Sequence, residues 1–126
     1  MELRELTTEE TIKFDYPGYF SSGEKPLICK IENKLGVSIH VIASQDKNRD
    51  REGKPYGDCA QIGIFKEIDN QPNLTAYIIE RNSSYEKLIE NTSRFLKEYS
   101  DALINNDYDS IIALLDSKGF ELYIQI

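Results

Sequence analysis

The spacing of the apolar residues changes at about residue 83, and this change constrains the fold more than any other feature. Before it, several short segments alternate apolar and polar residues, which is the period of a half-buried β-strand. After it, apolar residues return every three or four positions, as on one face of an amphipathic helix. Strands followed by helices predict an α+β fold.

The alternation is clearest in two pairs of segments. Residues 27–33 and 36–44 are joined by "NKLG", and residues 59–68 and 73–81 are joined by "DNQPN". Asp and Asn tolerate a left-handed backbone and proline fixes φ, so the second joint favours a turn. We therefore predict two antiparallel hairpins, each with one face toward a core and the other partly solvated. His40 falls on the polar side of this pattern.

The N-terminal segment has two interpretations. Thr7 and Glu10 have the spacing of a capping box, which would start a short helix. Ile12, Phe14 and Tyr16 instead alternate with charged residues, as in a strand. We expect the strand, over about residues 10–16.

Two helices are predicted after residue 83. The first begins with Ser83 and Glu86 at capping-box spacing, and "NND" at 105–107 ends it. The second starts at Asp107 or Asp109 and stops at Gly119. The first helix has a stripe of apolar positions at helical spacing: Tyr85, Leu88, Ile89, Thr92, Phe95, Leu96, Tyr99 and Leu103.

Residues 120–126 alternate again and predict a final strand. The expected fold class is therefore α+β, with a mostly antiparallel sheet of five to six strands. Two helices near the C-terminus pack on one face, and the chain ends on a strand. A length of 126 residues with 40% hydrophobic residues fits one domain over residues 1–126.

The stretch "ASQDKNRDREGKPYGD" at 43–58 contains eight charged residues, four acidic and four basic. Burying so many charges would cost more free energy than the fold supplies, so we expect a surface loop or an extension of both flanking strands. The mixed signs could protect a sheet edge or contact a partner. Both interpretations stay open.

The net charge of the chain indicates which classes of partner it can bind. There are 22 acidic and 15 basic residues, for a net charge of −7. Nucleic-acid binders usually present a basic face, so we expect no nucleic-acid partner. An acidic surface favours a basic protein partner, although the charge also serves solubility alone. No apolar run suggests a leader peptide or a bilayer span, so we expect a cytoplasmic protein without a membrane partner.

Few residues suit catalysis or metal binding. His40 is the single histidine, and Cys29 and Cys59 lack CxxC spacing. We expect both cysteines to be buried thiols, and a disulfide between them stays open. Nucleotide-binding glycine motifs and a nucleophile elbow are absent from the sequence. We therefore expect no catalytic residue, no metal and no cofactor.

What remains favours binding to another protein. A small acidic bacterial inhibitor of the immunity type, which neutralises a basic toxin or nuclease, fits this size and charge; an anti-defence protein of a phage would look the same. The candidate contact residues are charged residues of 43–58 and tyrosines in predicted loops: Tyr16, Tyr19, Asp46, Arg49, Asp50, Arg51, Glu52 and Tyr56. An acidic helix face is the alternative interface: Glu86, Glu90 and Asp101.

Two other functions stay open. One is an enzyme-like or small-molecule-binding domain with its pocket between the exposed sheet face and the Tyr-rich loop at 16–20. The other is an oligomeric accessory subunit that would expose an apolar patch.

Overall fold

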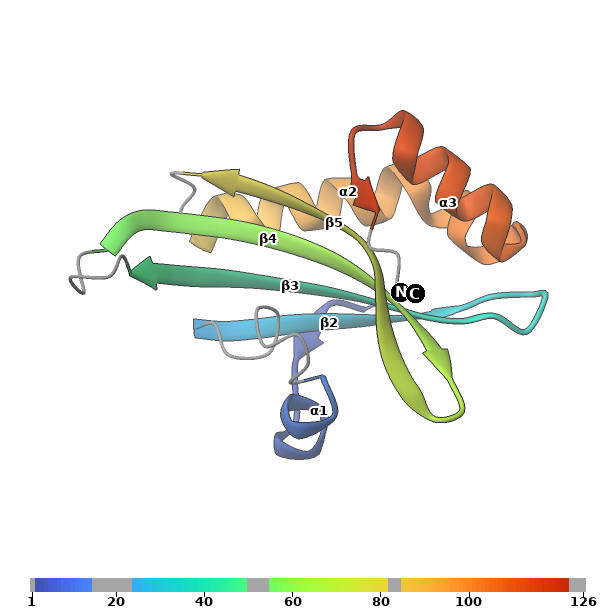
Figure 1. The fold of residues 1–126 in the computed structure, drawn as a ribbon, viewed down its shortest axis with the longest axis horizontal. Coiled ribbons are helices and arrows are strands. Elements are labelled where there is room, and N and C mark those ends of the chain that lie inside the picture. The colour runs from blue at the N-terminus through green and yellow to red at the C-terminus, as the bar shows by residue number, and fades with distance from the viewer. Residues whose placement is uncertain (1, 15–23, 50–54, 82–84, 123–126) are drawn as a thin grey trace.

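A computed structural model describes residues 2–14, 24–49, 55–81 and 85–122, with the side chains of 24–25, 45–49, 55–61 and 79–81 left aside. The described elements follow in the order β1 (Arg4–Glu5), α1 (Thr8–Lys13), β2 (Glu24–Glu32), β3 (Ser38–Arg49), β4 (Pro55–Ile68), β5 (Gln71–Arg81), α2 (Tyr85–Asn105), α3 (Tyr108–Ser117) and β6 (Glu121–Leu122). The strands form one antiparallel sheet in chain order, from β1 to β6. Helices α2 and α3 lie on one side of it and α1 on the other (Figure 1). The predicted α+β class, the C-terminal helices and the final strand are confirmed.

The two predicted hairpins are joined into one meander, because β3 and β4 pair along their length. The β4–β5 turn is two residues long, and Asp69 and Asn70 both have positive φ, at 52° and 63°. Such a backbone matches the twist of a hairpin and suits Asp and Asn. Of the predicted turn residues 69–73, the first two therefore form the turn.

One face of the sheet packs against α2 and α3 and holds the larger core. The apolar positions of the predicted hairpins supply the sheet side, among them Cys29, Val41 and Ile64, all nearly inaccessible to solvent. The predicted stripe of α2 supplies much of the other side: Leu88, Thr92, Phe95, Leu96 and Leu103 are buried. Ile89, which the stripe included, is instead 38% exposed.

The other face is partly solvated, as expected, with Lys30 and Glu32 of β2 exposed, but much of the rest is covered. A second cluster there contains Phe14, Ile28, Ile42, Phe65 and Leu74, all buried. Phe14 comes from the end of α1, and its ring meets that of Phe65 edge-on at 5.4 Å. The N-terminal segment therefore covers a second core that hairpin alternation alone did not indicate.

The predicted strand at 10–16 is wrong where the structure describes it: residues 8–13 form helix α1. The capping box is formed instead: Glu10 N–H donates to Thr7 Oγ1 at 3.2 Å and Thr7 N–H donates to Glu10 Oε1 at 2.9 Å. Arg4 adds a two-pronged contact to Glu10 at 2.6 and 2.8 Å. Chiefly through this hydrogen bond, Arg4 lowers the pKa of Glu10 to about 2.

The β2–β3 turn fixes the end of α2. Asn33 donates through Nδ2 to the carbonyls of Leu103 and Asn106, at 2.7 and 2.9 Å. Its Oδ1 accepts from the Leu35 amide at 2.8 Å, and Lys34 N–H donates to Ile104 O at 2.7 Å. Carbonyls that a helix end leaves without partners are thereby satisfied by the sheet. This turn holds the C-terminal end of α2 to one end of the sheet.

The predicted boundaries hold at the end of α2 and at both ends of α3. α2 ends at Asn105, and Asp107 caps α3 by accepting from the Ser110 amide at 2.8 Å. Gly119 has φ +88° just after α3, where a side chain would be strained. The predicted capping residue Ser83 lies outside the described residues.

The cysteines are not cross-strand neighbours. Cys29 pairs with Val41 across β2 and β3, whereas Cys59 pairs with Asp46 across β3 and β4. Cys29 is a free, buried thiol, and burial raises its pKa.

We expect Phe14→Ala to lower the free energy of unfolding by about 3 kcal/mol, because it removes one of the two phenylalanine rings of the second core. The matched control is Ile12→Ala on the same helix, whose side chain is 73% exposed. This control should change stability by less than about 0.5 kcal/mol. Urea unfolding of the two variants measures both, and equal losses would mean that α1 does not cover the sheet through Phe14.

Candidate functional site

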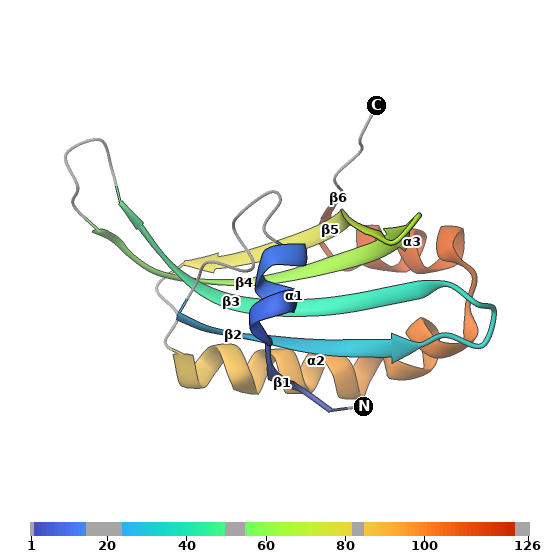
Figure 2. The ribbon, with the colours of Figure 1, turned by 90° about the horizontal axis from the view of Figure 1, so that it is seen from below.

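The charged stretch at 43–58 is mostly strand, and the second of our two expectations for it holds. The last pairs to neighbouring strands are Glu24 with Gln45 on one side and Arg81 with Cys59 on the other. Beyond them, among the described residues, 47–49 and 55–58 pair only with each other. We call these two segments the β3–β4 arm. Figure 2 shows the arm extending past the rest of the sheet.

The arm gathers part of the predicted contact set. Arg49 lies at the end of β3 opposite Pro55, and Tyr56 follows on β4. Asp46 lies at the base, opposite Cys59. The other candidates fall outside the described residues: Tyr16, Tyr19, Asp50, Arg51 and Glu52.

The outer face of α2, our alternative interface, is less acidic than its carboxylates suggest. Glu86, Glu90 and Asp101 are exposed, but Arg94 and Lys97 lie on the same side of the helix. The ion pair from Arg94 to Glu90 spans 3.2 Å with both side chains more than 60% exposed, so it contributes little stability. In Figure 2 the arm extends away from α2, so the two candidate interfaces are separate surfaces.

A shallow groove on the helical side was not predicted from the sequence. Its floor is apolar: Ile62 and Ile78 come from β4 and β5, Phe95 from α2, and Phe120 from the segment before β6. The rings of Phe95 and Phe120 lie 5.4 Å apart. The cavity measures about 200 Å³.

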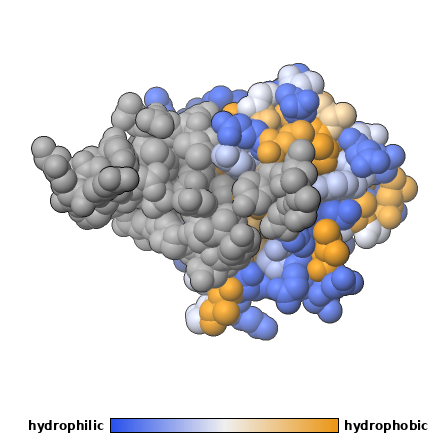
Figure 3. Space-filling view, viewed as in Figure 1, coloured by the Kyte–Doolittle hydropathy of each residue, from blue (hydrophilic) through white to orange (hydrophobic). Residues whose placement is uncertain are grey.

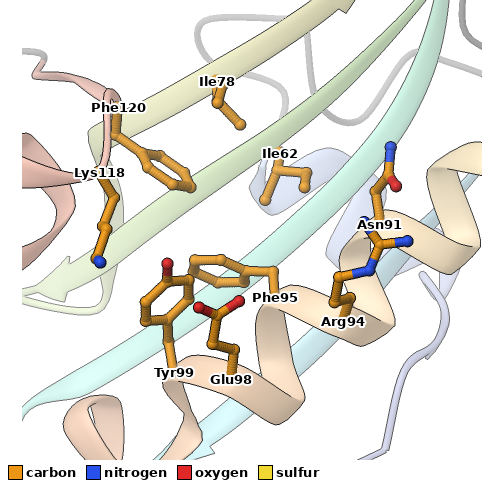
Figure 4. A pocket seen from close by; sticks show the side chains of 9 residues that line it. All are labelled: Ile62, Ile78, Asn91, Arg94, Phe95, Glu98, Tyr99, Lys118 and Phe120. Carbon is orange, nitrogen blue, oxygen red and sulfur yellow. The ribbon is translucent and has the colours of Figure 1, made fainter.

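The rim of the groove is polar and carries both signs of charge. It consists of Asn91, Arg94, Glu98 and Tyr99 on α2 and Lys118 after α3. In Figure 4 the polar ends of Lys118 and Tyr99 lie on one side and those of Arg94 and Asn91 on the other, with the Glu98 carboxylate between them. Burial and the negative charge of Glu98 raise the pKa of Tyr99, so its phenol stays protonated at neutral pH.

A second hollow, of about 360 Å³, lies between Leu3 and α2. Lys97 is the one charged residue among those that line it, beside Ser93 and Ser100. With a single exposed cation and two hydroxyls, it offers fewer charged groups to a ligand than the groove does.

His40 is buried rather than exposed, which corrects its predicted place. It lies on the sheet face that α1 covers, 7% exposed, with its ring 5.2 Å from that of Phe14. Its Nδ1 atom has no hydrogen-bond partner among the described residues. Burial lowers the pKa of His40, and the nearest charges are Glu67 on β4, Lys13 and Glu10 on α1, and Lys30 on β2.

Lys13 connects α1 to the sheet beside this histidine. Its Nζ lies 2.7 Å from Glu67 Oε1, while Ser38 Oγ donates to Glu67 Oε2 at 3.2 Å. The hydrogen bond from Lys13 is the main cause that lowers the pKa of Glu67. The histidine and its neighbours therefore hold α1 against the sheet.

Within the described ranges, no three His, Cys, Asp or Glu side chains gather closely enough to hold a metal ion. No described helix combines the length and the apolar character needed to cross a bilayer. In comparisons with known proteins, no protein-family model, curated protein or solved structure matches the chain.

We expect the protein to lose stability as the pH falls from about 7.5 to 5.5, because of His40. Its pKa in the folded protein lies below the ordinary value of 6.5, so the unfolded chain binds the proton more readily. The contribution is complete above pH 6.5 and is lost as the pH falls through the pKa of the folded state. Glu10 acts in a lower window, since its contribution is complete above pH 4.5 and declines toward 2.

The measurement is the urea midpoint against pH for the wild type and His40→Phe, which keeps a ring against Phe14 but cannot titrate. The variant should show a flatter profile between about pH 7.5 and 5.5. Parallel profiles would assign the acid sensitivity to other groups.

Proposed function

We propose that this chain is a non-enzymatic protein-binding domain: a small bacterial inhibitor of the immunity type that acts in the cytoplasm and neutralises a basic toxin or nuclease. The observation that carries the proposal is the β3–β4 arm. Its described strands pair only with each other beyond the body of the sheet. A segment that is not needed to close the sheet is available for contacts outside the molecule.

The composition of the arm supports a protein partner. The stretch 43–58 has four acidic and four basic residues together with Tyr56. Tyrosine and arginine are enriched where partners make their strongest contacts, and paired charges of both signs set the register of an interface. A phosphate backbone would favour cations alone.

The preference for a basic partner rests on the remainder of the chain. Because the stretch 43–58 is electrically neutral, the net charge of −7 belongs to the other residues. A surface potential of this sign speeds the encounter with a basic protein and weakens as salt is added.

Self-assembly through an apolar patch has less support. Among the side chains that the structure describes, four large apolar ones are exposed, and they come from α1, the β2–β3 turn, β4 and α2: Ile12, Leu35, Ile68 and Ile89. On the face drawn in Figure 3, the apolar residues outside the grey region form separate patches among polar ones.

The first experiment is recovery of partners by the tagged protein from a lysate of its source organism, followed by co-expression with what is recovered. We expect one basic protein in near-equal amount, released by high salt and toxic unless the chain is co-expressed. Recovery of no protein other than the chain itself would contradict the proposal.

We expect the combined variant Arg49→Glu, Asp50→Arg, Arg51→Glu and Glu52→Arg to weaken binding of that partner by about tenfold or more. The swap leaves the net charge unchanged, so a loss reports local contacts rather than steering. The matched control is Lys97→Glu with Asp101→Lys on α2, which also conserves charge. If the control loses binding and the arm variant keeps it, the interface is the face of α2.

A further inference from the structure

The groove beside α2 offers a second site, independent of the proposed partner. α2 packs mainly over β3, with fewer contacts to β4 and β2, while α3 contacts β5 and β6. The sheet side chains between the two helices, Ile62 and Ile78, are therefore the floor of an open groove. Ile62 is 8% exposed and Ile78 is partly buried, so the apolar surface that they present is small, and it attracts only a small apolar group from solution.

The size of the groove limits what enters it. At about 200 Å³ it is smaller than the roughly 300–1,000 Å³ of pockets that enclose drug-sized ligands. One aromatic ring or branched alkyl group fills such a space. The rings of Phe95 and Phe120 offer the edges and faces against which another ring packs.

The charges of the rim select the polar part of the ligand. Among the described residues no carboxylate pairs with the Lys118 ammonium, and Arg94 has only its exposed pair with Glu90. Glu98 supplies a carboxylate between these cations (Figure 4). A lone anion would meet the repulsion of Glu98 and Glu90, and a lone cation that of Lys118 and Arg94. More distant acids matter little, because the screening length at physiological salt is about 8 Å.

We propose that this groove binds a free α-amino acid with an apolar side chain of phenylalanine or leucine size. The side chain lies on Ile62, Ile78, Phe95 and Phe120. The ammonium group faces Glu98, and the carboxylate faces Lys118 or Arg94. All of these side chains line the groove.

The test is an NMR titration of the full chain, ¹⁵N-labelled, with L-phenylalanine, phenylacetate and phenethylamine. The three probes share a ring and differ in charge. We expect saturable shifts at the residues of the groove for phenylalanine, with a Kd of about 1 mM for so small a ligand. Each single-charge probe should bind at least about threefold more weakly. Absence of saturation, or equal binding of a single-charge probe, would overturn the proposal.

Variants locate the two charges. Glu98→Gln should weaken phenylalanine about threefold or more and leave phenylacetate no weaker, while Lys118→Gln should weaken phenylalanine and phenylacetate together. The matched control is Lys97→Gln, an exposed cation of α2 outside the groove. All three positions are exposed, so the fold should survive each change. Wild-type binding in both groove variants would also overturn the site, whatever the fate of the partner experiment.

Discussion

The structure depends on one constraint: the central strands carry apolar side chains on both faces, so both faces must be covered. Val41 and Ile64 point toward α2 and α3, whereas Ile42 and Phe65 point toward the side of α1. Burial of apolar surface stabilises the fold by about 25 cal/mol per Å², so each face contributes this stability only where another element packs over it. The position of α1, its contacts with His40 and the burial of Phe14 follow from that requirement.

The lengths of the elements explain why cover is incomplete. β4 has 14 residues and α2 has 21, which correspond to about 46 Å of strand and about 31 Å of helix. A helix of that length cannot cover the strand from end to end. Where strand exceeds helix, the sequence changes from apolar alternation to charge, and β3 and β4 continue as the arm. Between α2 and the segment after α3, a shallow groove lies over apolar residues that are mostly buried.

The parts of the fold that could be predicted depend on short-range patterns. Apolar residues at every second position predicted the hairpins, and apolar residues at every third or fourth position predicted the helices. Asp107 and Gly119 marked the two ends of α3, which the structure confirms. The error at the N-terminus arose because six residues can satisfy two patterns at once. Ile12 and Phe14 alternate as in a strand, yet the Ile12 side chain is 73% exposed. The apolar character of Ile12 therefore did not indicate a buried position. Arg4, which ties Glu10 at 2.6 Å, lies outside the window in which either pattern is judged.

The candidate sites were harder to predict because they arise between elements. The arm has no apolar alternation, so its charge indicated exposure without indicating strand. The groove joins Ile62, Ile78, Phe95 and Phe120, which the sequence separates by up to 58 positions and assigns to a filled core. It lies between α2, the sheet and the segment after α3. Asn33 contacts residues 103 and 106, where α2 ends and the chain turns toward α3. No local signal marks Asn33 as more than a turn residue.

Under the proposed function, the β3–β4 arm and the remainder of the chain, here called the body, contribute differently to recognition of the partner. The acidic body acts at a distance of about one screening length and accelerates encounter with any basic protein, so by itself it discriminates poorly. The stretch 43–58 has no net charge and cannot steer, but the order of its mixed charges favours registers in which a partner presents complementary charges. Registers or partners that place like charges opposite each other are disfavoured by repulsion. Selectivity among basic partners would therefore come from the order of charges along 43–58 rather than from their sum.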